Sequence, residues 1–366
     1  MKKIVIISRT IYPSINPRAH RATELAKEFS RKGHNVILYG EMGDNNFYSF
    51  ENKYNLKVKN IGPLLFSSKL KKNIFIRIVG GLIERIIGRL IEFPDIELVG
   101  KVKNILSNEK DIDLLITVAV PHPIHWGAAS YKKENPENFA KTWIADCGDP
   151  YKKNPYLKTY PWLEKNEKIF CKECDYITVP IKSAVSSYGN EFKNKIVIIP
   201  QGFAIPRMTN QKNYKKNATV TFSYAGSFYK NLRDPRPFLR FLKDFDRDFR
   251  FILYIQNTSF ASKEIDALGD KVVVNSFIDR DSLIKNFSNY DFLINFENVE
   301  KNQSPSKLID YAISGRPVYS IPNNEKDFFD FLRFYDGDYS NAIKLPEISE
   351  YDIKIVAEKF LQLAKK

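Results

Sequence analysis

The sequence predicts an α/β protein built from two doubly wound, Rossmann-like domains. Short apolar runs, typical of buried parallel strands, alternate along the chain with helix patterns whose apolar residues recur every three or four positions. Such alternation indicates a mostly parallel sheet covered by helices. A polar, lysine-rich stretch at 207–219, RMTNQKNYKKNAT, interrupts the pattern, and a second series begins after it. The length of 366 residues suits two domains better than one.

The first series starts with KIVIIS at 3–8, which predicts a buried strand. A polar loop and the helix pattern RATELAKEFSRKG follow, and Gly33 ends this helix before the strand NVILYG at 35–40. This strand–helix–strand unit is of the doubly wound type. Further strands are expected at 53–61, 113–119, 142–146, 176–180 and 196–200, and helices at 161–173 and 181–190. We interpret residues 1–206 as the N-terminal domain.

The second series predicts another α/β domain at 217–348. Its strands are expected at 220–226, 249–256, 271–277, 290–296 and 317–321, and its helices at 235–243, 281–288 and 305–314. A last helix at 349–366 closes the chain and can cross back to the first domain. Ligands of such folds bind at the carboxyl ends of the parallel strands. We therefore expect the two domains to face one another across a cleft that receives both sets of strand ends.

The composition is basic, with a net charge of +14. This charge favours polyanionic partners: nucleic acid, an anionic membrane surface or phosphorylated substrates. The sequence shows no aromatic–basic motif of a known nucleic-acid-binding module, so we expect no specific nucleic-acid partner.

The three cysteines, Cys147, Cys171 and Cys174, are an odd and small number, which favours a reducing compartment. Cys171 and Cys174 form a single CxxC without a second Cys/His pair at zinc spacing, so we predict no metal site. No apolar run approaches the roughly 20 residues of a membrane-spanning helix. The first apolar run is too short for a secretory signal. We expect a cytoplasmic location, with peripheral attachment to the inner face of the membrane as an option.

The segment at 302–322, NQSPSKLIDYAISGRPVYSIP, has the composition of a phosphate-binding helix start. Ser304 suits the cap and Pro305 the first turn. The free backbone N–H groups and the dipole of a helix start favour a phosphate, and Lys307 adds a full charge. Asp310 lies one turn further on, where an acidic residue can accept hydrogen bonds from ribose hydroxyls. The segment fits a nucleotide diphosphate joined to sugars. A capped surface helix with an i, i+3 Lys–Asp pair fits it equally well.

The same segment resembles the donor site of GT-B fold glycosyltransferases, of the retaining group 1 (family 4-like) type that builds bacterial surface glycans. Many members carry two glutamates eight positions apart. Here Asp310 stands at the second position and Asn302 at the first, and Pro-Ser-Lys replaces a Gly-containing phosphate loop. Other segments resemble the family in the same order, so that the likeness covers about the whole chain: YPSINPRAHRATELAKEFSRKGHNVILYG, KTWIADCGDPY, CDYITVP with KIVIIPQGF, and FSYAGSFYKNLRDPRPFLRFL.

This resemblance implies transfer of a sugar, with retention, from a UDP- or GDP-sugar to a glycan or lipid-linked acceptor, in lipopolysaccharide, capsule or other surface polysaccharide synthesis. It implies no cofactor and no metal, because helix ends and cations hold the phosphates. A basic pair after the first strand of the second domain, Lys230 and Arg233, would stabilise the charge of the leaving diphosphate. An ordinary basic loop is the alternative. The remaining donor-site residues that the resemblance implies are Gly226, Ser227, Ser304, Pro305, Ser306, Lys307, Leu308 and Asp310.

In the first domain, AVPHPIHWG follows a strand and precedes a helix. The family often has a histidine here that contacts the donor sugar, and His122 is our first choice before His125; a capping or packing role is equally compatible. Neither has a carboxylate at useful spacing, which argues against a hydrolase triad. Asp146 and Asp149 also follow a strand and are candidates for the acceptor site, as is Arg18, which is available to a phosphate or acceptor.

The stretch at 69–93 predicts a basic amphipathic helix that can lie on anionic lipid. Apolar residues recur at a spacing of four, and arginines fall on another side: Ile74, Ile78, Leu82, Ile86 and Leu90, then Arg77, Arg85 and Arg89. A helix packed on the first domain is the alternative. For the whole chain, two other functions remain open, a nucleotide-sugar 2-epimerase of the same fold and an inactive scaffold or binding member. The Pro-Ser-Lys segment favours the transferase.

Overall fold

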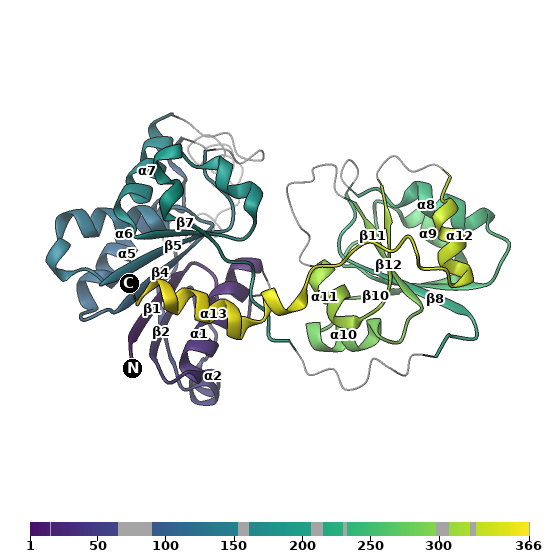
Figure 1. The fold of residues 1–366 in the computed structure, drawn as a ribbon, viewed down its shortest axis with the longest axis horizontal. Coiled ribbons are helices and arrows are strands. Elements are labelled where there is room, and N and C mark those ends of the chain that lie inside the picture. Colours follow the sequence, from purple (N-terminus) through teal and green to yellow (C-terminus); the bar gives the residue numbers. More distant parts are fainter. Residues whose placement is uncertain are drawn as a thin grey trace, which may run out of the picture. The chain divides into compact units, whose positions relative to one another are not determined.

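A computed structural model describes residues 1–14, 16–64, 90–152, 161–205, 215–229, 233–297, 307–322 and 327–365. The chain forms two compact units (Figure 1). Unit 1 comprises Met1–Ala204 and Glu350–Lys366, and unit 2 comprises Ile205–Ser349. From the sequence we predicted domains at 1–206 and 217–348 and a closing helix at 349–366. Of the expected amphipathic helix at 69–93, residues 69–89 lie outside the described residues.

Unit 1 contains a seven-stranded parallel sheet in the order β3-β2-β1-β4-β5-β6-β7. The strands are β1 Lys3–Ser8, β2 Asn35–Gly40, β3 Lys57–Asn60, β4 Leu114–Ala119, β5 Thr142–Cys147, β6 Tyr176–Val179 and β7 Ile196–Ile198. In the centre, Ile6 pairs with Leu38 on one side and Ile116 on the other. The continuous apolar runs at 3–8 and 114–119 thus form the buried central strands that they predicted.

The helices of unit 1 cover both faces of this sheet (Figure 1). They are α1 Pro17–Arg31, α2 Tyr48–Tyr54, α5 Glu97–Asn108, α6 Pro123–Glu134, α7 Pro161–Glu173 and α13 Ile353–Leu363. Side chains of a strand alternate between faces. Val5 and Ile7 accordingly join the core under α5, α6 and α7, whereas Ile4 and Ile6 join the core under α1 and α13.

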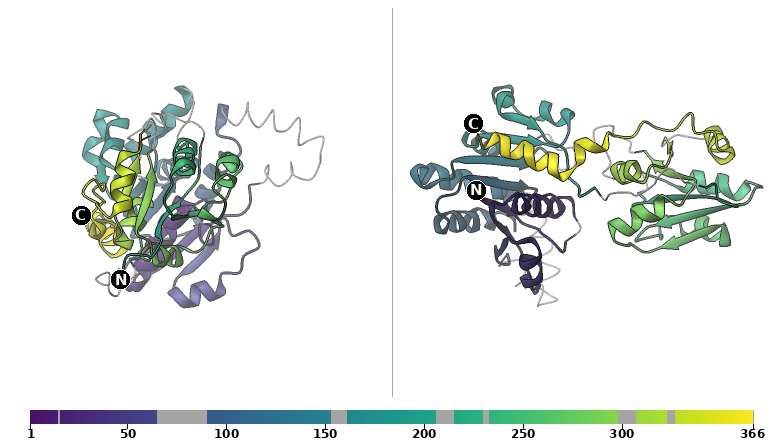
Figure 2. Two further views of the ribbon diagram at one scale, coloured as in Figure 1. Left: turned by 90° about the vertical axis from the view of Figure 1, so that its right-hand side faces the viewer. Right: turned by 60° about the horizontal axis from the view of Figure 1, so that its bottom comes forward.

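The closing helix α13 packs against α1, as the second view of Figure 2 illustrates. Val356, Ala357 and Phe360 enter the same core as Leu25 of α1. The backbone of Phe203 holds the residues that lead into α13. Its N–H donates a hydrogen bond to the Tyr351 carbonyl, and its carbonyl accepts one from the Ile353 N–H. The last residues of the chain therefore belong to the unit that contains the first.

The prediction of an α-helix at 181–190 is wrong. The chain forms two short 3₁₀ segments there, Lys182–Ser187 and Asn190–Lys195. Serine side chains compete with the helical hydrogen bonds, as the Ser186 hydroxyl does by donating to the Ser183 carbonyl at 2.9 Å. Gly189 then separates the two segments.

Unit 2 contains a five-stranded parallel sheet in the order β10-β9-β8-β11-β12. Its strands are β8 Val220–Ala225, β9 Phe249–Tyr254, β10 Val272–Asn275, β11 Phe292–Phe296 and β12 Val318–Ile321. Its helices are α8 Arg236–Asp244, α9 Ser262–Asp266, α10 Arg280–Phe287, α11 Lys307–Ser314 and α12 Phe329–Asp336. Aromatic rings fill its core: the ring of Phe222 stacks on that of Phe292 at 5.0 Å and meets that of Phe331 edge-on at 5.3 Å.

The strand order reverses between β1 and β4 in unit 1, and between β8 and β11 in unit 2. Ligands of open α/β sheets bind beyond the carboxyl ends of the strands at such switch points. Helix α11 follows β11 and so belongs to the switch point of unit 2. Among the described residues, no helix is long and apolar enough to cross a membrane.

Candidate functional site

Lys307, the first residue of α11, carries a buried ammonium group. Its Nζ lies 4.5 Å from the ring centroid of Tyr224, at the end of β8. Within the described part of the chain, this Nζ has no hydrogen-bond partner. Burial lowers the pKa of Lys307 well below its usual value, and the nearby charge of Arg233 lowers it further. An added anion beside this amine would therefore stabilise its charged form.

Arg233 approaches the same tyrosine from the loop after β8. The backbones of Tyr229 and Arg233 pair in both directions, with N–O distances of 3.1 and 2.9 Å, and this pairing holds the two residues side by side. Burial raises the pKa of Tyr224 to about 12, and the charge and hydrogen bond of Arg233 oppose that rise. Lys307 and Arg233 thus converge on one ring, although they lie far apart in the sequence.

Gly226 lets the loop leave β8 tightly around Tyr224. Its φ of 146° lies in the region that favours glycine. A Cβ there would come within 2.9 Å of the Tyr224 hydroxyl. That hydroxyl donates to the carbonyl of Ser227 at 3.1 Å, and the Gly226 N–H donates to the carbonyl of Tyr254 at 3.1 Å. Gly226 and Ser227, both predicted site residues, therefore determine the backbone course of the loop beside Lys307 and Arg233.

Tyr311 fixes the start of α11 over the switch point. Its hydroxyl donates to the Ile294 carbonyl of β11 at 3.0 Å and accepts from the Ala225 N–H of β8 at 3.3 Å. Leu308 is half-buried and packs in the core cluster that includes Tyr311. The helix is therefore joined to the two strands whose ends define the site.

Asp310 forms an ion pair with Arg280, the first residue of α10. Arg280 Nε and Nη2 lie 2.7 and 2.6 Å from Asp310 Oδ1. Burial raises the pKa of Asp310, and the charge of Arg280 opposes that rise. Arg280 was not predicted from the sequence, because nothing in its local pattern distinguishes it from other basic residues. The residues Lys230, Asn302, Ser304, Pro305 and Ser306 lie outside the described residues.

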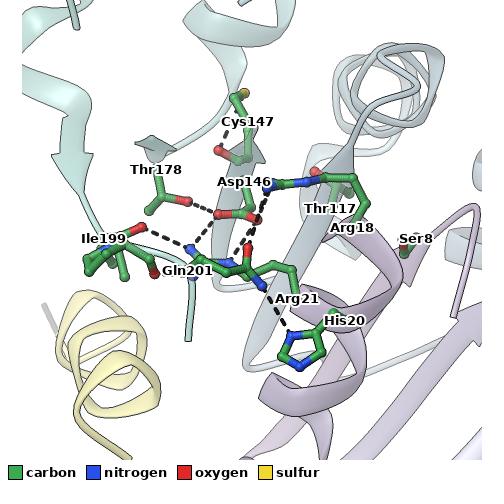
Figure 3. A network of polar contacts seen from close by, with 12 residues as sticks. Ser8, Arg18, His20, Arg21, Thr117, Asp146, Cys147, Thr178, Ile199 and Gln201 are labelled. Atoms are coloured by element: carbon green, nitrogen blue, oxygen red, sulfur yellow. Dashed lines mark hydrogen bonds and ion pairs between the residues drawn. The ribbon is translucent and has the colours of Figure 1, made fainter. Parts of the chain in front are cut away.

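In unit 1, Asp146 is the centre of a buried polar network (Figure 3). Arg21 Nε and Nη2 donate to its carboxylate at 3.1 and 2.8 Å, and the Thr178 hydroxyl donates at 2.7 Å. Burial alone would raise the pKa of Asp146. The charge and hydrogen bonds of Arg21, with the charge of Arg18 and the Thr178 bond, outweigh burial and lower it. Both oxygens of the Asp146 carboxylate thus already accept hydrogen bonds from side chains of the protein.

Arg18 lies beside this network at the start of α1. Its Nη1 is 3.7 Å from Asp146 Oδ2, and its Nη2 donates to Gln201 Oε1 over 3.4 Å, both long contacts (Figure 3). Gly148 makes room for it, because a Cβ at Gly148 would come within 2.6 Å of Arg18 Cζ. Asp149, one residue further along, is exposed. Arg21 and Gln201 were not predicted; their roles depend on contacts with distant parts of the chain.

His122 lies in an aromatic environment, apart from the Asp146 network. Its ring faces those of Tyr151 at 5.2 Å and Phe170 at 6.4 Å. Neither ring nitrogen has a hydrogen-bond partner in the described ranges. Burial lowers the pKa of His122 to about 4, although the nearby backbone of Asp149 favours the charged form. His125, by contrast, is held by the Thr117 hydroxyl at 2.7 Å.

The structure therefore groups the predicted residues into two sets, one in each unit. Unit 2 brings together Gly226, Ser227, Arg233 and Lys307, with Leu308 and Asp310 on the same helix as the lysine. Unit 1 brings together Arg18 and Asp146, with Asp149 close by in sequence and His122 in separate packing. No group of three metal-binding side chains occurs among the residues that the structure describes.

Two parallel doubly wound sheets with these switch-point sites define the GT-B class of fold, and solved structures confirm it. The apo form of the lipopolysaccharide outer core galactosyltransferase WaaB matches with a TM-score of 0.61 at 10% identity, over 99% of this chain and 98% of WaaB. Anabaena HepE in complex with UDP and glucose matches with a TM-score of 0.61 at 9% identity, over 100% of both chains. A putative UDP-N-acetylglucosamine 2-epimerase from Listeria monocytogenes matches with a TM-score of 0.55 at 10% identity, over 99% of this chain and 95% of its own.

The chain thus has the GT-B fold, and the predicted resemblance to GT-B glycosyltransferases is confirmed at the level of the fold. Neither the known protein-family profiles nor the curated protein sequences include a match to this chain.

Proposed function

We propose that this protein is a glycosyltransferase that moves a sugar from a nucleotide-sugar donor, a UDP- or GDP-sugar, to a glycan or lipid-linked acceptor. Synthesis of lipopolysaccharide, capsule or another surface polysaccharide, with retention at the anomeric carbon, is part of the same proposal. The observation that carries it is the convergence of Lys307 and Arg233 on Tyr224 at the switch point of unit 2. The GT-B fold shared with WaaB, and with HepE in its complex with UDP and glucose, supports it.

The two cations suit the charge that sugar transfer creates. The bond between the anomeric carbon and the donor diphosphate breaks, and its electron pair leaves with the nucleoside diphosphate. The acceptor hydroxyl oxygen bonds to that carbon, and its proton passes to the leaving phosphate. Lys307 and Arg233 would stabilise the negative charge that accumulates on the leaving group. The backbone N–H groups and the dipole at the start of α11 would contribute in the same direction.

Further residues have supporting roles in this proposal. Gly226 and Ser227 allow the backbone to approach the diphosphate, and Asp310, oriented by Arg280, accepts from the ribose hydroxyls. His122 contacts the donor sugar as a neutral imidazole. On sequence alone, the diphosphate site also includes Lys230, Ser304, Pro305 and Ser306.

For the acceptor we propose Arg18 and Asp149 as the contacting groups. The polar contacts of the Arg18 guanidinium to Asp146 and Gln201 are long, at 3.7 and 3.4 Å, and Asp149 is exposed. Asp146 belongs to this acceptor site by position. Since Arg21 and Thr178 already saturate its carboxylate, we assign it the role of positioning Arg18.

The test is a thermal-shift panel with UDP-, GDP-, ADP- and CMP-linked sugars. We expect one nucleotide to stabilise the protein, and Lys307→Ala and Arg233→Ala to remove that shift. Lys285→Ala is the matched control, because Lys285 is an exposed lysine of the same unit. A shift that survives both site variants would overturn the proposed diphosphate site. Transfer and hydrolysis assays with the bound donor then separate an active enzyme from an inactive scaffold.

A nucleotide-sugar 2-epimerase is the second candidate, because a putative enzyme of that name shares the fold. Both functions predict nucleotide-sugar binding through Lys307 and Arg233, so binding alone does not separate them. Incubation of the bound donor without acceptor does: an epimerase converts it to a 2-epimer of unchanged mass, whereas a transferase leaves it intact or hydrolyses it slowly. Nuclear magnetic resonance of the sugar protons distinguishes these products.

A further inference from the structure

Helix α7 of unit 1 presents one aromatic residue and three lysines to solvent. Among the helix residues whose side chains the structure describes, the exposed ones are Trp162, Lys165, Lys168 and Lys172. At about 100° per residue these four positions fall within an arc of about 120°. The buried positions lie on the opposite side: Leu163, Glu167, Phe170 and Cys171. None of these four exposed residues is acidic, and we call them the α7 face; the partly exposed Glu164 and Glu173 border it.

Trp162 is fixed at one end of the α7 face with its ring outward. The side chain of Trp162 is 53% exposed, and its Nε1 donates to the Leu90 carbonyl at 2.7 Å. Ile91, next to Leu90, is 43% exposed. A tryptophan whose N–H is already satisfied and whose ring is open is suited to the boundary between water and lipid.

The three lysines give this face an uncompensated positive charge. Lys165, Lys168 and Lys172 form no ion pair with other residues in the described part of the chain, whereas Glu164, at the border of the face, is paired with Lys152 at 2.7 Å. At the carboxyl end of the helix, the Lys195 ammonium donates to the carbonyls of Lys172 and Cys174 at 2.6 and 2.7 Å. This ammonium adds a further cation at the same end.

We propose that the α7 face docks the protein on an anionic phospholipid surface. The lysines would contact the headgroups, and Trp162 with Ile91 would enter the interfacial layer. Each lysine near such a surface increases binding roughly fivefold. The exposed apolar groups favour a lipid surface over nucleic acid, because a polyanion alone gives them no apolar layer to enter. Docking of this kind needs no nucleotide sugar, so its test is independent of the test of the proposed catalytic function.

The experiment measures co-sedimentation of the whole protein with vesicles of phosphatidylcholine, alone or with a third of phosphatidylglycerol. We expect binding to the anionic vesicles only, with a loss of roughly 100-fold in the combined variant Lys165→Gln, Lys168→Gln, Lys172→Gln. Added salt should weaken binding by the parent protein. Trp162→Ala should weaken it while leaving its salt dependence in place.

The matched control carries the same charge change on exposed lysines of unit 2: Lys243→Gln, Lys263→Gln and Lys285→Gln. Equal loss in this control would assign binding to total charge and overturn the proposal. The proposal would also be overturned if the α7 variant bound the anionic vesicles as the parent does. The same holds if substitution of Arg77, Arg85 and Arg89, and not of the α7 lysines, removed vesicle binding. The protein could instead bind duplex DNA more tightly than vesicles at physiological salt and lose this binding in the α7 variant. That result would overturn the proposal and identify nucleic acid as the partner of the α7 face. The nucleotide-sugar thermal shift should be the same in all variants, which separates this test from that of the catalytic site.

Discussion

The ammonium of Lys307 lies 4.5 Å from the ring centroid of Tyr224, and this contact joins the start of α11 to the end of β8. The negative face of the ring attracts the cation. Since no described residue bonds to Nζ, the ring replaces the lost water only in part. Burial and the nearby charge of Arg233 therefore lower the pKa of Lys307 well below its usual value.

We first predict a pH dependence that comes from Lys307. Its folded-state pKa is lowered below that of the unfolded chain, so the unfolded state binds more protons between the two values. Stability of the free protein should therefore rise with pH up to about 10.4, by at most about 1.4 kcal/mol per pH unit from this group. Lys307→Met should remove this part of the slope and raise stability at neutral pH. Chemical unfolding of both proteins across this range measures the difference, and identical slopes would contradict it.

The same amine should couple donor binding to proton uptake. A bound diphosphate stabilises the charged lysine, so binding should take up a proton wherever the free site is neutral. Affinity for the nucleotide diphosphate should consequently fall as pH rises through that range. Calorimetric titration in two buffers of different ionisation enthalpy measures the uptake, and Lys307→Met should show none from this group.

Gly226→Ala should disturb the donor loop. The positive φ of Gly226 costs an alanine about 1–3 kcal/mol, and the added Cβ meets the Tyr224 hydroxyl at 2.9 Å. We expect a lower melting temperature together with a weaker nucleotide shift. Gly33→Ala is the control, because Gly33 has a φ of 83° and an added Cβ there meets nothing within 4 Å. Its substitution should lower stability and leave the nucleotide shift as in the parent.

Asp146→Asn should destabilise unit 1 by about 3–5 kcal/mol, because it leaves Arg21 buried without its partner charge. The lowered pKa of Asp146 means that its contribution is fully present above the unfolded-state value of about 3.9 and is lost as pH falls through the folded-state value. Thermal unfolding between neutral and acid pH should show this loss in the parent and not in the variant. Asp149→Asn, at an exposed position, should change stability little.

His122 should contribute an acid-labile part of the stability. Its folded-state pKa of about 4 lies below the ordinary 6.5, so the unfolded state binds more protons between these values. Stability should therefore fall by about 3 kcal/mol as pH drops from 6.5 to 4. His122→Phe should flatten this part of the pH profile.

The same variant tests the proposed sugar contact. If His122 meets the donor sugar, His122→Phe should weaken binding of the nucleotide sugar and leave binding of the nucleotide diphosphate unchanged. Equal affinities of parent and variant for the nucleotide sugar would contradict that role.

The strands of the described residues could be predicted because most of them are short apolar runs between polar or glycine-containing turns; β3, with the sequence KVKN, is an exception. Helices α2, α5, α9 and α12 were not predicted. In FDFLRFYD of α12, aromatic residues occur on several sides, so its pattern has no clear period. The segment at 181–190 contains a helix-length pattern, but its serines and glycine favour short 3₁₀ turns.

The sequence by itself determined the fold class and the candidate Lys307, because buried strands and helix starts are local features of the chain, whereas Arg233 became a candidate through the resemblance to GT-B glycosyltransferases. Only the tertiary structure decided that both cations meet at Tyr224, that Arg280 pairs with Asp310, and that Arg21 pairs with Asp146. These relations join residues from separate strands and helices. Their distances depend on strand order and helix packing, which local sequence patterns do not specify.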